Sequence, residues 1–347
     1  MLNRVHKKGS VRIVAAAKLS KNRYPSMQSS LLEQVRAGCK AVAERAAHIQ
    51  IQYDLIPSYA ASLLDAKPAV PEHDPASHYL GMGDDTAAFF LTLDSINFGS
   101  GYFPHMKKRP GMSGYYTVAG CLNDHFRESG PLSALKLSCL TPEDCFRIFK
   151  QNQQNRPIAE LMRFFARALN DLGRYVQADF GGSFTGLIEA AGSSAERLIR
   201  LLIQMPYFCD VELYDAVKVP FYKRAQLAAA DLSLAFGGRG LGCFDDLRNL
   251  TIFADNLVPH VLRLENILIY PEALIQHIEA GKLIPAGSAE EIEIRACALH
   301  AVERLKDALN ASGHAITSME LDFILWNRGQ QPAYKSIPRH RTRTTFY

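Results

Sequence analysis

Helical periodicity constrains the fold of this chain more than any other feature. Within residues 156–178, apolar side chains recur every three or four positions, at Ile158, Leu161, Phe165, Leu169, Leu172 and Val176. This spacing is typical of a helix that buries one face. The pattern returns in residues 194–205, 224–236 and 291–309. The sequence therefore predicts a compact, mainly α protein.

Strand signals are few and short. Residues 49–53 alternate between apolar and polar side chains, residues 89–98 are apolar and aromatic, and residues 115–118 are β-prone. The stretch 99–114 is rich in glycine and proline, which is typical of a turn-rich connection. We therefore expect one small β element near residues 89–120 within the helical fold.

Composition and charge exclude several classes of protein. The 347 residues include 48% hydrophobic and 21% charged residues, which excludes a disordered or fibrous chain. The net charge of +4 is too small to indicate a nucleic-acid coat. No run reaches the roughly 18 apolar residues of a membrane helix. The apolar run in residues 11–17 is short for a signal peptide, so we expect a helix that opens near Val11 and a cytoplasmic protein.

The seven cysteines do not form a recognisable metal or disulfide pattern. Their number is odd, no two have CxxC spacing, and most lie among apolar residues. A disulfide framework or a zinc site would show paired, regular spacing. We expect buried free thiols.

Three acidic residues lie inside apolar segments, where a charge is unusual. Asp255 follows the apolar run 250–254, Asp322 lies within residues 319–326, and Asp94 lies within residues 91–98. A buried carboxylate must be paired, hydrogen-bonded or functional. Asp255 could simply cap a helix, since Pro259 follows closely. Carboxylates and aromatic residues in one pocket are also the usual equipment for cleaving a glycosidic bond.

Other segments allow more than one interpretation. Phe221–Gln226 places Lys223 and Arg224 beside two aromatic residues at the start of a predicted helix, as an anion site or as a solvated basic turn. The glycine-rich segment 237–242 follows a helix, which favours a plain loop over a dinucleotide site or a DNA-contacting hairpin. The tail 338–347 is basic but ends in two aromatic residues, so it is either solvated or packed back onto the protein.

Four segments in a fixed order resemble one known family. They are FYKRAQLAAAD, LTIFADNLVPHVLR, EIEIRACALHAVERL and LDFILWN. Together they resemble the queuosine salvage protein family, the queuosine 5′-phosphate N-glycosylases, from about residue 80 to the C-terminus. The resemblance implies hydrolysis of the N-glycosidic bond of queuosine 5′-monophosphate, with release of the base queuine. It also implies a helical fold similar to helix–hairpin–helix DNA glycosylases and no metal or redox cofactor.

The resemblance also implies roles for particular residues. The catalytic aspartate of the family corresponds to Asp255, which follows Phe253 and Ala254, and its functional lysine corresponds to Lys223. Phe253 would offer a stacking face. Asn256 stands where the family usually has tyrosine, and it could still hydrogen-bond the base or the ribose.

A second motif of the family implies the residues that recognise the base. It corresponds to Asp322, Phe323, Trp326 and Asn327, and Asn327 stands where a second acid is usual. Asp322 would accept hydrogen bonds from the guanine-like edge of the base, Phe323 would stack on it, and Asn327 could hydrogen-bond it. The 5′-phosphate calls for a basic pocket, for which Arg224, Arg239 and Arg295 are candidates that the sequence does not distinguish.

Together these observations predict a hydrolase with a small-molecule substrate, no stable nucleic-acid partner and no membrane association. Residues 1–80 would form an N-terminal helical segment, which could belong to the same domain, and residues 81–347 the helical catalytic region. Two alternatives stay open. One is a DNA or RNA base-excision glycosylase, and the other is a non-catalytic binder of a modified nucleoside or tRNA. The sequence does not indicate the oligomeric state.

Overall fold

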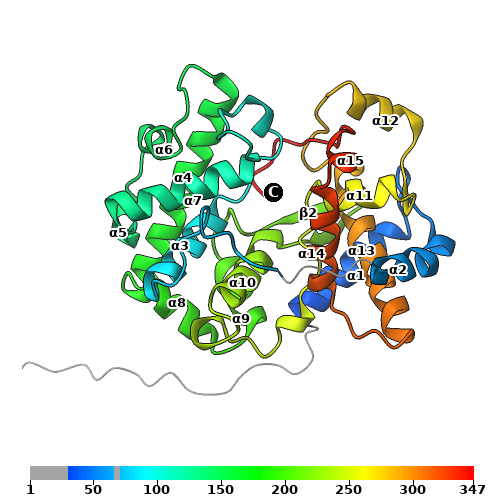
Figure 1. Ribbon diagram of the computed structural model, residues 1–347, viewed down its shortest axis with the longest axis horizontal. Helices are drawn as coiled ribbons and strands as arrows, with labels where there is room; N and C mark the ends of the chain where they lie inside the picture. Colours follow the sequence, from blue (N-terminus) through cyan, green and yellow to red (C-terminus); the bar gives the residue numbers. More distant parts are fainter. Residues whose placement is uncertain (1–29, 66–70) are drawn as a thin grey trace, which may run out of the picture.

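The computed structural model describes residues 30–65 and 71–347, and it is mainly helical (Figure 1). The helix predicted near Val11 lies outside the described residues. The α-helices are α1 (Leu31–Ala43), α2 (Ile56–Asp65), α3 (Asp84–Ser95), α4 (Gly114–Ser129), α5 (Ala134–Ser138), α6 (Pro142–Ile148), α7 (Arg156–Phe180), α8 (Phe184–Ala191), α9 (Ala195–Leu202), α10 (Lys223–Ala235), α11 (Val258–Leu264), α12 (Glu272–Glu279), α13 (Ala289–Ala311), α14 (Ser318–Gly329) and α15 (Pro332–Lys335). The strands are β1 (Gln50–Ile51), β2 (Val211–Tyr214), β3 (Val217–Pro220) and β4 (Leu268–Ile269).

The strongly periodic segments form the helices that were expected. In α7 the six periodic apolar side chains are all buried. The Asn155 side chain caps its first turn, and Gly181 ends it in a left-handed conformation that glycine adopts without strain. The segments 194–205, 224–236 and 291–309 correspond to α9, α10 and α13. The prediction of a mainly α fold is confirmed.

The prediction of a small β element near residues 89–120 is wrong. Residues 89–95 belong to α3, and residues 115–118 belong to α4. Every residue of α3 from Thr86 to Ser95 is buried, so the helix has no polar face to reveal its period. In α4 the Ser113 side chain caps the helix, and tertiary packing outweighs the β propensity of the first turn. The stretch between the two helices is an irregular connection, as predicted.

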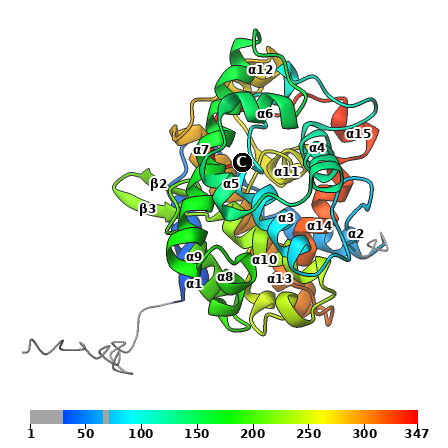
Figure 2. The same ribbon diagram turned by 90° about the vertical axis from the view of Figure 1, so that its left-hand side faces the viewer.

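The strands form two small antiparallel sheets elsewhere in the chain. β2 and β3 make a hairpin whose two turn residues, Asp215 and Ala216, both have positive φ angles of 44° and 63°. Such a turn suits the twist of a hairpin, but it lacks the Asn-Gly signal by which it could be recognised. Figure 2 shows this hairpin extending from one side of the molecule. β1 pairs with β4, so the alternation in residues 49–53 did indicate a strand.

The helices gather into two groups with α10 between them (Figure 1). One group holds α3 to α9, and the other holds α1, α2 and α11 to α15. Within the second group, α1 and α2 pack against α13. The division of the chain into an N-terminal segment, residues 1–80, and a catalytic region, residues 81–347, stays a prediction. None of the described helices is long and apolar enough to cross a bilayer.

The tail 338–347 packs back onto the protein instead of extending into solvent. It crosses from the second group of helices to the first, and His340, Thr342 and Tyr347 are buried (Figure 1). The Gly99 N–H donates to the Tyr347 carbonyl oxygen at 3.0 Å. A Cβ atom on Gly101 would lie 2.3 Å from the Thr342 carbonyl oxygen, so only glycine lets the two segments pass this closely.

All seven cysteines are free thiols. Cys39, Cys121, Cys145 and Cys297 are buried, as expected. The other three, Cys139, Cys209 and Cys243, are exposed, so the expectation of buried thiols holds for only part of the set.

Candidate active site

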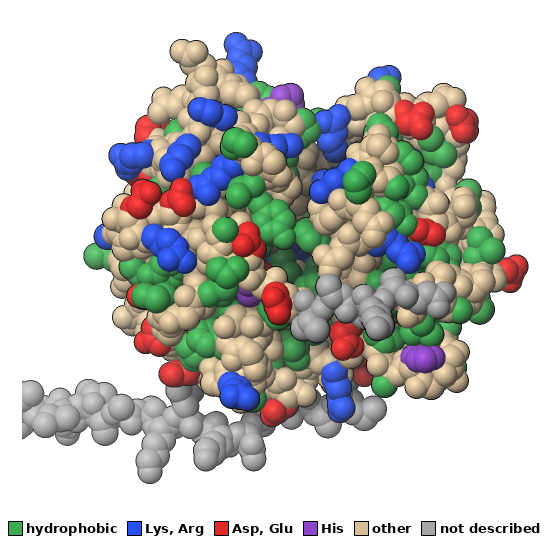
Figure 3. All heavy atoms as spheres, viewed as in Figure 1, with side chains coloured by type: hydrophobic (Ala, Val, Ile, Leu, Met, Phe, Trp, Pro, Cys, Tyr) green, Lys and Arg blue, Asp and Glu red, His purple; other side chains and the backbone are tan. Residues whose placement is uncertain are grey.

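A cavity of about 910 Å³ opens between the two groups of helices, as the hollow in Figure 3 shows. Its walls come from the connection between α3 and α4, from one face of α10, from residues 255–257, from α14 and from the tail. Its volume is in the range of small-molecule sites. Six of the seven residues predicted from the sequence line it, namely Lys223, Asp255, Asn256, Asp322, Phe323 and Asn327.

Lys223 is the first residue of α10, and an unusual backbone conformation places it there. The residue before it, Tyr222, has the left-handed φ angle of 49°, which costs energy for a side chain of this size. The Asp210 carbonyl oxygen accepts the N–H groups of Phe221 and Tyr222, and an Asp210 carboxylate oxygen accepts the N–H of Lys223 at 3.3 Å. Asp210 therefore holds the start of α10 against the cavity.

A buried ion pair connects Lys223 to the segment that carries Asp255. The Arg295 guanidinium donates to both carboxylate oxygens of Asp210, at 3.1 and 2.6 Å, and both side chains are almost completely buried. Arg295 Nε also donates to the Ala254 carbonyl oxygen at 3.0 Å. The Arg295 guanidinium thus fixes both the backbone next to Asp255 and the Asp210 carboxylate that anchors Lys223. We call Asp210 and Arg295 the clamp.

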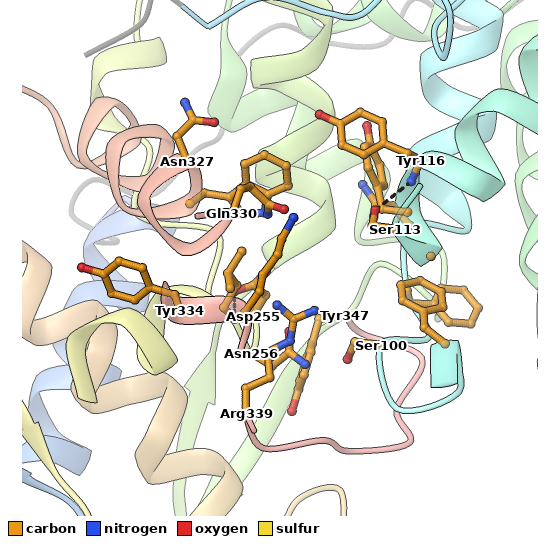
Figure 4. A pocket seen from close by; sticks show the side chains of 18 of the residues that line it. Ser100, Ser113, Tyr116, Asp255, Asn256, Asn327, Gln330, Tyr334, Arg339 and Tyr347 are labelled. Atoms are coloured by element: carbon orange, nitrogen blue, oxygen red, sulfur yellow. Dashed lines mark hydrogen bonds between the residues drawn. The ribbon is translucent and has the colours of Figure 1, made fainter. Parts of the chain in front are cut away.

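Asp255 is half-buried, and its two carboxylate oxygens have different surroundings. Oδ1 accepts the N–H groups of Leu257 and Val258, at 2.7 and 3.2 Å, and so caps the start of α11. Among the described residues, none donates a hydrogen bond to Oδ2. The cap expected as an alternative is present, and it also orients the carboxylate. Figure 4 shows Asp255 in the middle of the cavity.

Lys223, Asp255 and Asp322 form an electrostatic group. Burial lowers the pKa of Lys223, and the negative charge of Asp255 opposes this effect. Burial raises the pKa of Asp322 well above its ordinary value, and the charge of Asp255 raises it further. Low-dielectric surroundings strengthen each of these interactions. Perturbed groups of this kind are typical of catalytic sites.

The residues of the second motif lie on α14, along the wall that faces α4. Asp322 Oδ1 accepts the Phe253 N–H at 2.9 Å. Phe323 lines the cavity, and the Phe253 ring packs edge-on behind it, with ring centroids 6.2 Å apart. Phe253 is not among the residues that line the cavity, so its ring supports Phe323 rather than facing a ligand directly. Asn327 is exposed at the rim (Figure 4).

Asn256 is buried, and its side chain has a structural contact. Its amide group donates to the His340 carbonyl oxygen at 3.2 Å, which fixes the tail against the cavity. The tail residue Arg339 lines the cavity, and its guanidinium points toward Asp255 (Figure 4). Burial lowers the pKa of Arg339, and the nearby Asp255 charge opposes this.

The three arginines considered for the phosphate do not line the cavity. Arg224 is buried and donates to the carbonyl oxygens of Asp94, Ser95, Tyr207 and Thr345. Arg295 is used by the clamp. Arg239 is exposed in the loop after α10. Arginines inside apolar segments are structural here, because a buried guanidinium needs several oxygen partners.

The sequence did not reveal four further side chains of the cavity. Asp231 lies on α10 eight residues after Lys223, so both residues share one face of the helix. Tyr115 and Tyr116 come from α4, and the Tyr116 ring packs edge-on against Trp326 with centroids 6.4 Å apart. Arg339 is the fourth. The spacing of Lys223 and Asp231 was the one signal that could have been used. Within the described residues, no group of three or more His, Cys, Asp or Glu is placed to hold a metal ion.

Comparison with known proteins identifies the family to which this chain belongs. A model of the queuosine salvage protein family matches residues 77–347. The chain belongs to this family. A Sphaerobacter thermophilus protein named queuosine 5′-phosphate N-glycosylase/hydrolase is 36% identical over 313 residues, which cover 89% of this chain and 96% of that protein. Proteins of the same name from Dictyostelium discoideum and Mus musculus are 33% and 29% identical. These two matches cover 76% and 90% of this chain, and 78% and 98% of the relatives. The resemblance predicted from the sequence is confirmed.

Proposed function

We propose that this queuosine salvage family protein hydrolyses the N-glycosidic bond of queuosine 5′-monophosphate and releases queuine. One observation carries the proposal in the structure. Asp255 lies in a cavity large enough for a nucleotide, with one carboxylate oxygen held by backbone N–H groups and the other left for a ligand. A fixed carboxylate of this kind can stabilise a cation that develops on a bound sugar.

The chemistry of the leaving base determines how much of the barrier the carboxylate must lower. Queuine is a 7-deazapurine, so it has carbon where a purine has N7, and the enzyme cannot activate it by protonating that position. More of the barrier must therefore be lowered at the ribosyl cation. Asp255 Oδ2 would lie against the anomeric carbon, stabilise the positive charge there or attack it, and water would complete the hydrolysis. Lys223 would keep Asp255 ionised and oriented.

Asp322 and Phe323 would recognise the base. The guanine-like edge of queuine presents the N1–H and the exocyclic amine, and a carboxylate accepts both. In the protein itself burial raises the pKa of Asp322, whereas hydrogen bonds from the Phe253 N–H and from the base favour the charged form. Base binding would therefore be coupled to release of the Asp322 proton. Phe323 would stack on the ring, with Asn327 at the rim.

Arg339 is the cation that we assign to the 5′-phosphate. It lines the cavity beside Asp255, and no described residue accepts a hydrogen bond from its guanidinium. Arg341 also lines the cavity, but it donates to the Gly281 carbonyl oxygen at 2.7 Å. A free guanidinium can bind a phosphate with two parallel hydrogen bonds. Asn256 would act indirectly, by holding the tail that carries Arg339.

The test is to incubate the purified protein with queuosine 5′-monophosphate, queuosine and guanosine 5′-monophosphate, and to measure released base by chromatography. We expect queuine from the monophosphate and much slower release from the other two. Arg339→Ala should reduce kcat/KM for the monophosphate by about 10- to 100-fold and leave that for queuosine unchanged, because it removes a charge-assisted contact to phosphate alone. No release from any of the three by folded protein would refute the proposal. An equal loss on both queuosine substrates would refute the role of Arg339.

A further inference from the structure

A second pair of acids borders the cavity beyond Lys223. Asp231 lies on the same face of α10, about 12 Å further along the helix axis at 1.5 Å per residue. Its side chain lines the cavity, although the residue is only 5% exposed. Asp94 on α3 is completely buried and lies against Asp231, since α3 packs on α10. Neither acid has a role in the chemistry proposed above.

The charge of Lys223 acts on this pair, but Lys223 forms no ion pair with either acid. Neither carboxylate forms an ion pair with any Lys, Arg or His of the described chain, and among the same residues Asp94 Oδ2 has no hydrogen-bond partner. Asn97 approaches Asp94 Oδ1 only at 3.5 Å. Burial raises the pKa of Asp231 to about 7 and that of Asp94 well above its ordinary value; the charge of Asp231 adds to the effect on Asp94, and the charge of Lys223 opposes both shifts. Two carboxyls in one buried site do not both ionise readily, so the pair carries at most one negative charge.

Aromatic rings surround this charge on the other sides. Tyr115 and Tyr116 come from α4, and His73 and His78 come from the segment before α3. His73 Nε2 lies 3.0 Å from the Asp231 carbonyl oxygen, and this nitrogen therefore carries a hydrogen. His78 Nδ1 lies 3.0 Å from the Asp74 carbonyl oxygen, and its Nε2 lies 2.9 Å from the Tyr115 hydroxyl.

Both histidines are neutral at pH 7. Burial lowers the pKa of His73, and it lowers the pKa of His78 to about 4, with His73 as a second cause. They therefore supply no cation to the acids. A negative charge that has no ion-paired cation and lies next to electron-rich rings is what an ammonium ligand requires.

We propose that Asp231, supported by Asp94, binds a protonated amine on the leaving base and so selects 7-deazapurine nucleotides with an aminomethyl group at C7. The inference rests on the proposed function. The aminomethyl group of queuine is attached through its methylene carbon to C7 of the five-membered ring, at a different edge of the base from the N1–H that Asp322 would read. Asp231 on α10 lies close to Tyr116 of α4, whereas Asp322 lies on α14, so the two acids come from different walls of the cavity. A base held between these walls would present one edge to each acid.

Four 5′-monophosphates test this selection. Two carry the amine, queuosine and 7-aminomethyl-7-deazaguanosine, and two are neutral, 7-cyano-7-deazaguanosine and 7-deazaguanosine. In the wild type we expect kcat/KM to be about 10- to 100-fold higher for the amines, as a hydrogen bond to a charged group provides. Asp231→Asn should lower kcat/KM for the amines by that factor and change it less than about threefold for the neutral pair. Asp307→Asn, on the surface, is the matched control, since the ion-pair partner of Asp307 within the described residues is the exposed Arg304.

Equal losses on all four substrates in Asp231→Asn would overturn the inference, because they would indicate a role in the chemistry or in the fold. In the wild type, a ratio near one between kcat/KM for the amines and kcat/KM for the neutral pair would also overturn it. This measurement does not depend on whether the variant folds. If the wild type released no base at all, the proposed function would fail separately. Calorimetry of the free bases would then decide the inference. Tighter binding of 7-aminomethyl-7-deazaguanine than of 7-deazaguanine would support it, and equal binding would overturn it.

Discussion

Replacing Arg295 with methionine tests whether the clamp holds Lys223 and Asp255, the residues that we propose to be catalytic, in place. The substitution keeps an apolar stem but removes the guanidinium, and so leaves the Asp210 carboxylate buried without its cation. Breaking a buried ion pair in this way costs about 3–5 kcal/mol. The Ala254 carbonyl oxygen also loses its donor, which adds about 1 kcal/mol. The total of about 4–6 kcal/mol is a quarter or more of the roughly 5–15 kcal/mol by which a typical domain is stable.

The loss can be measured by urea denaturation and by thermal unfolding. The unfolding entropy of about 2.1 cal/mol/K per residue gives about 0.7 kcal/mol/K for a chain of 347 residues. A total cost of about 4–6 kcal/mol should therefore lower Tm by about 6–8 °C. Arg304→Met is the matched control, because the Arg304–Asp307 pair is about half exposed, and its loss should cost less than about 1 kcal/mol.

A double variant separates stability from positioning. Asp210→Asn combined with Arg295→Met removes the unpaired charge, so it should be more stable than Arg295→Met alone. Its kcat should stay low, because Lys223 and the backbone before Asp255 no longer share an anchor. The reasoning is refuted if Arg295→Met costs less than about 1 kcal/mol. It is also refuted if the double variant recovers the wild-type kcat.

Three more predictions concern the base, the acid pair and the tail. Asp322→Asn should raise KM by about 10- to 100-fold and affect kcat less, because it weakens base recognition; steady-state kinetics with unchanged KM would contradict this role. The pKa of Asp231 is raised from 3.8 to about 7 by burial, so between pH 4 and 7 the unfolded chain releases a proton that the folded protein keeps, and stability falls as pH rises. Asp231→Asn should reduce that fall in urea denaturation at pH 5 and pH 7, whereas an identical fall in both proteins would contradict the assignment. Gly101→Ala should displace the tail, because the new Cβ would lie 2.3 Å from the Thr342 carbonyl oxygen; we expect lower Tm and faster proteolysis of the tail, and an unchanged Tm would show that the close approach does not matter.

The sequence predicted the amphipathic helices well, because a half-buried helix shows its period in the residues. It failed at α3, where burial on all sides removes the polar face, and at the hairpin turn, where Asp215 and Ala216 adopt positive φ angles without a glycine. In these places the conformation is set by packing against residues far away in the chain. Such packing cannot be read from local spacing.

The site residues that were predicted have a local signal in the sequence, whereas those that were missed depend on packing against distant residues. Asp255 and Asp322 stand out as acids inside apolar runs, and both line the cavity. Asp231 lies in an ordinary helical pattern, and Arg339 lies in a tail whose packing depends on contacts such as that of Asn256 with His340. Arg224 looked like a ligand-binding cation, but its partners are carbonyl oxygens from distant segments, which only the fold brings together.

Asp255→Asn tests the central claim most directly. Single-turnover hydrolysis of queuosine 5′-monophosphate should be slowed at least about a thousandfold, since the variant removes the charge that stabilises the ribosyl cation. The amide can still accept the hydrogen bonds at the start of α11, so circular dichroism and the affinity for the substrate should stay close to those of the wild type. Turnover at nearly the wild-type rate, in a variant that folds and binds, would contradict the assignment of Asp255 as the catalytic residue.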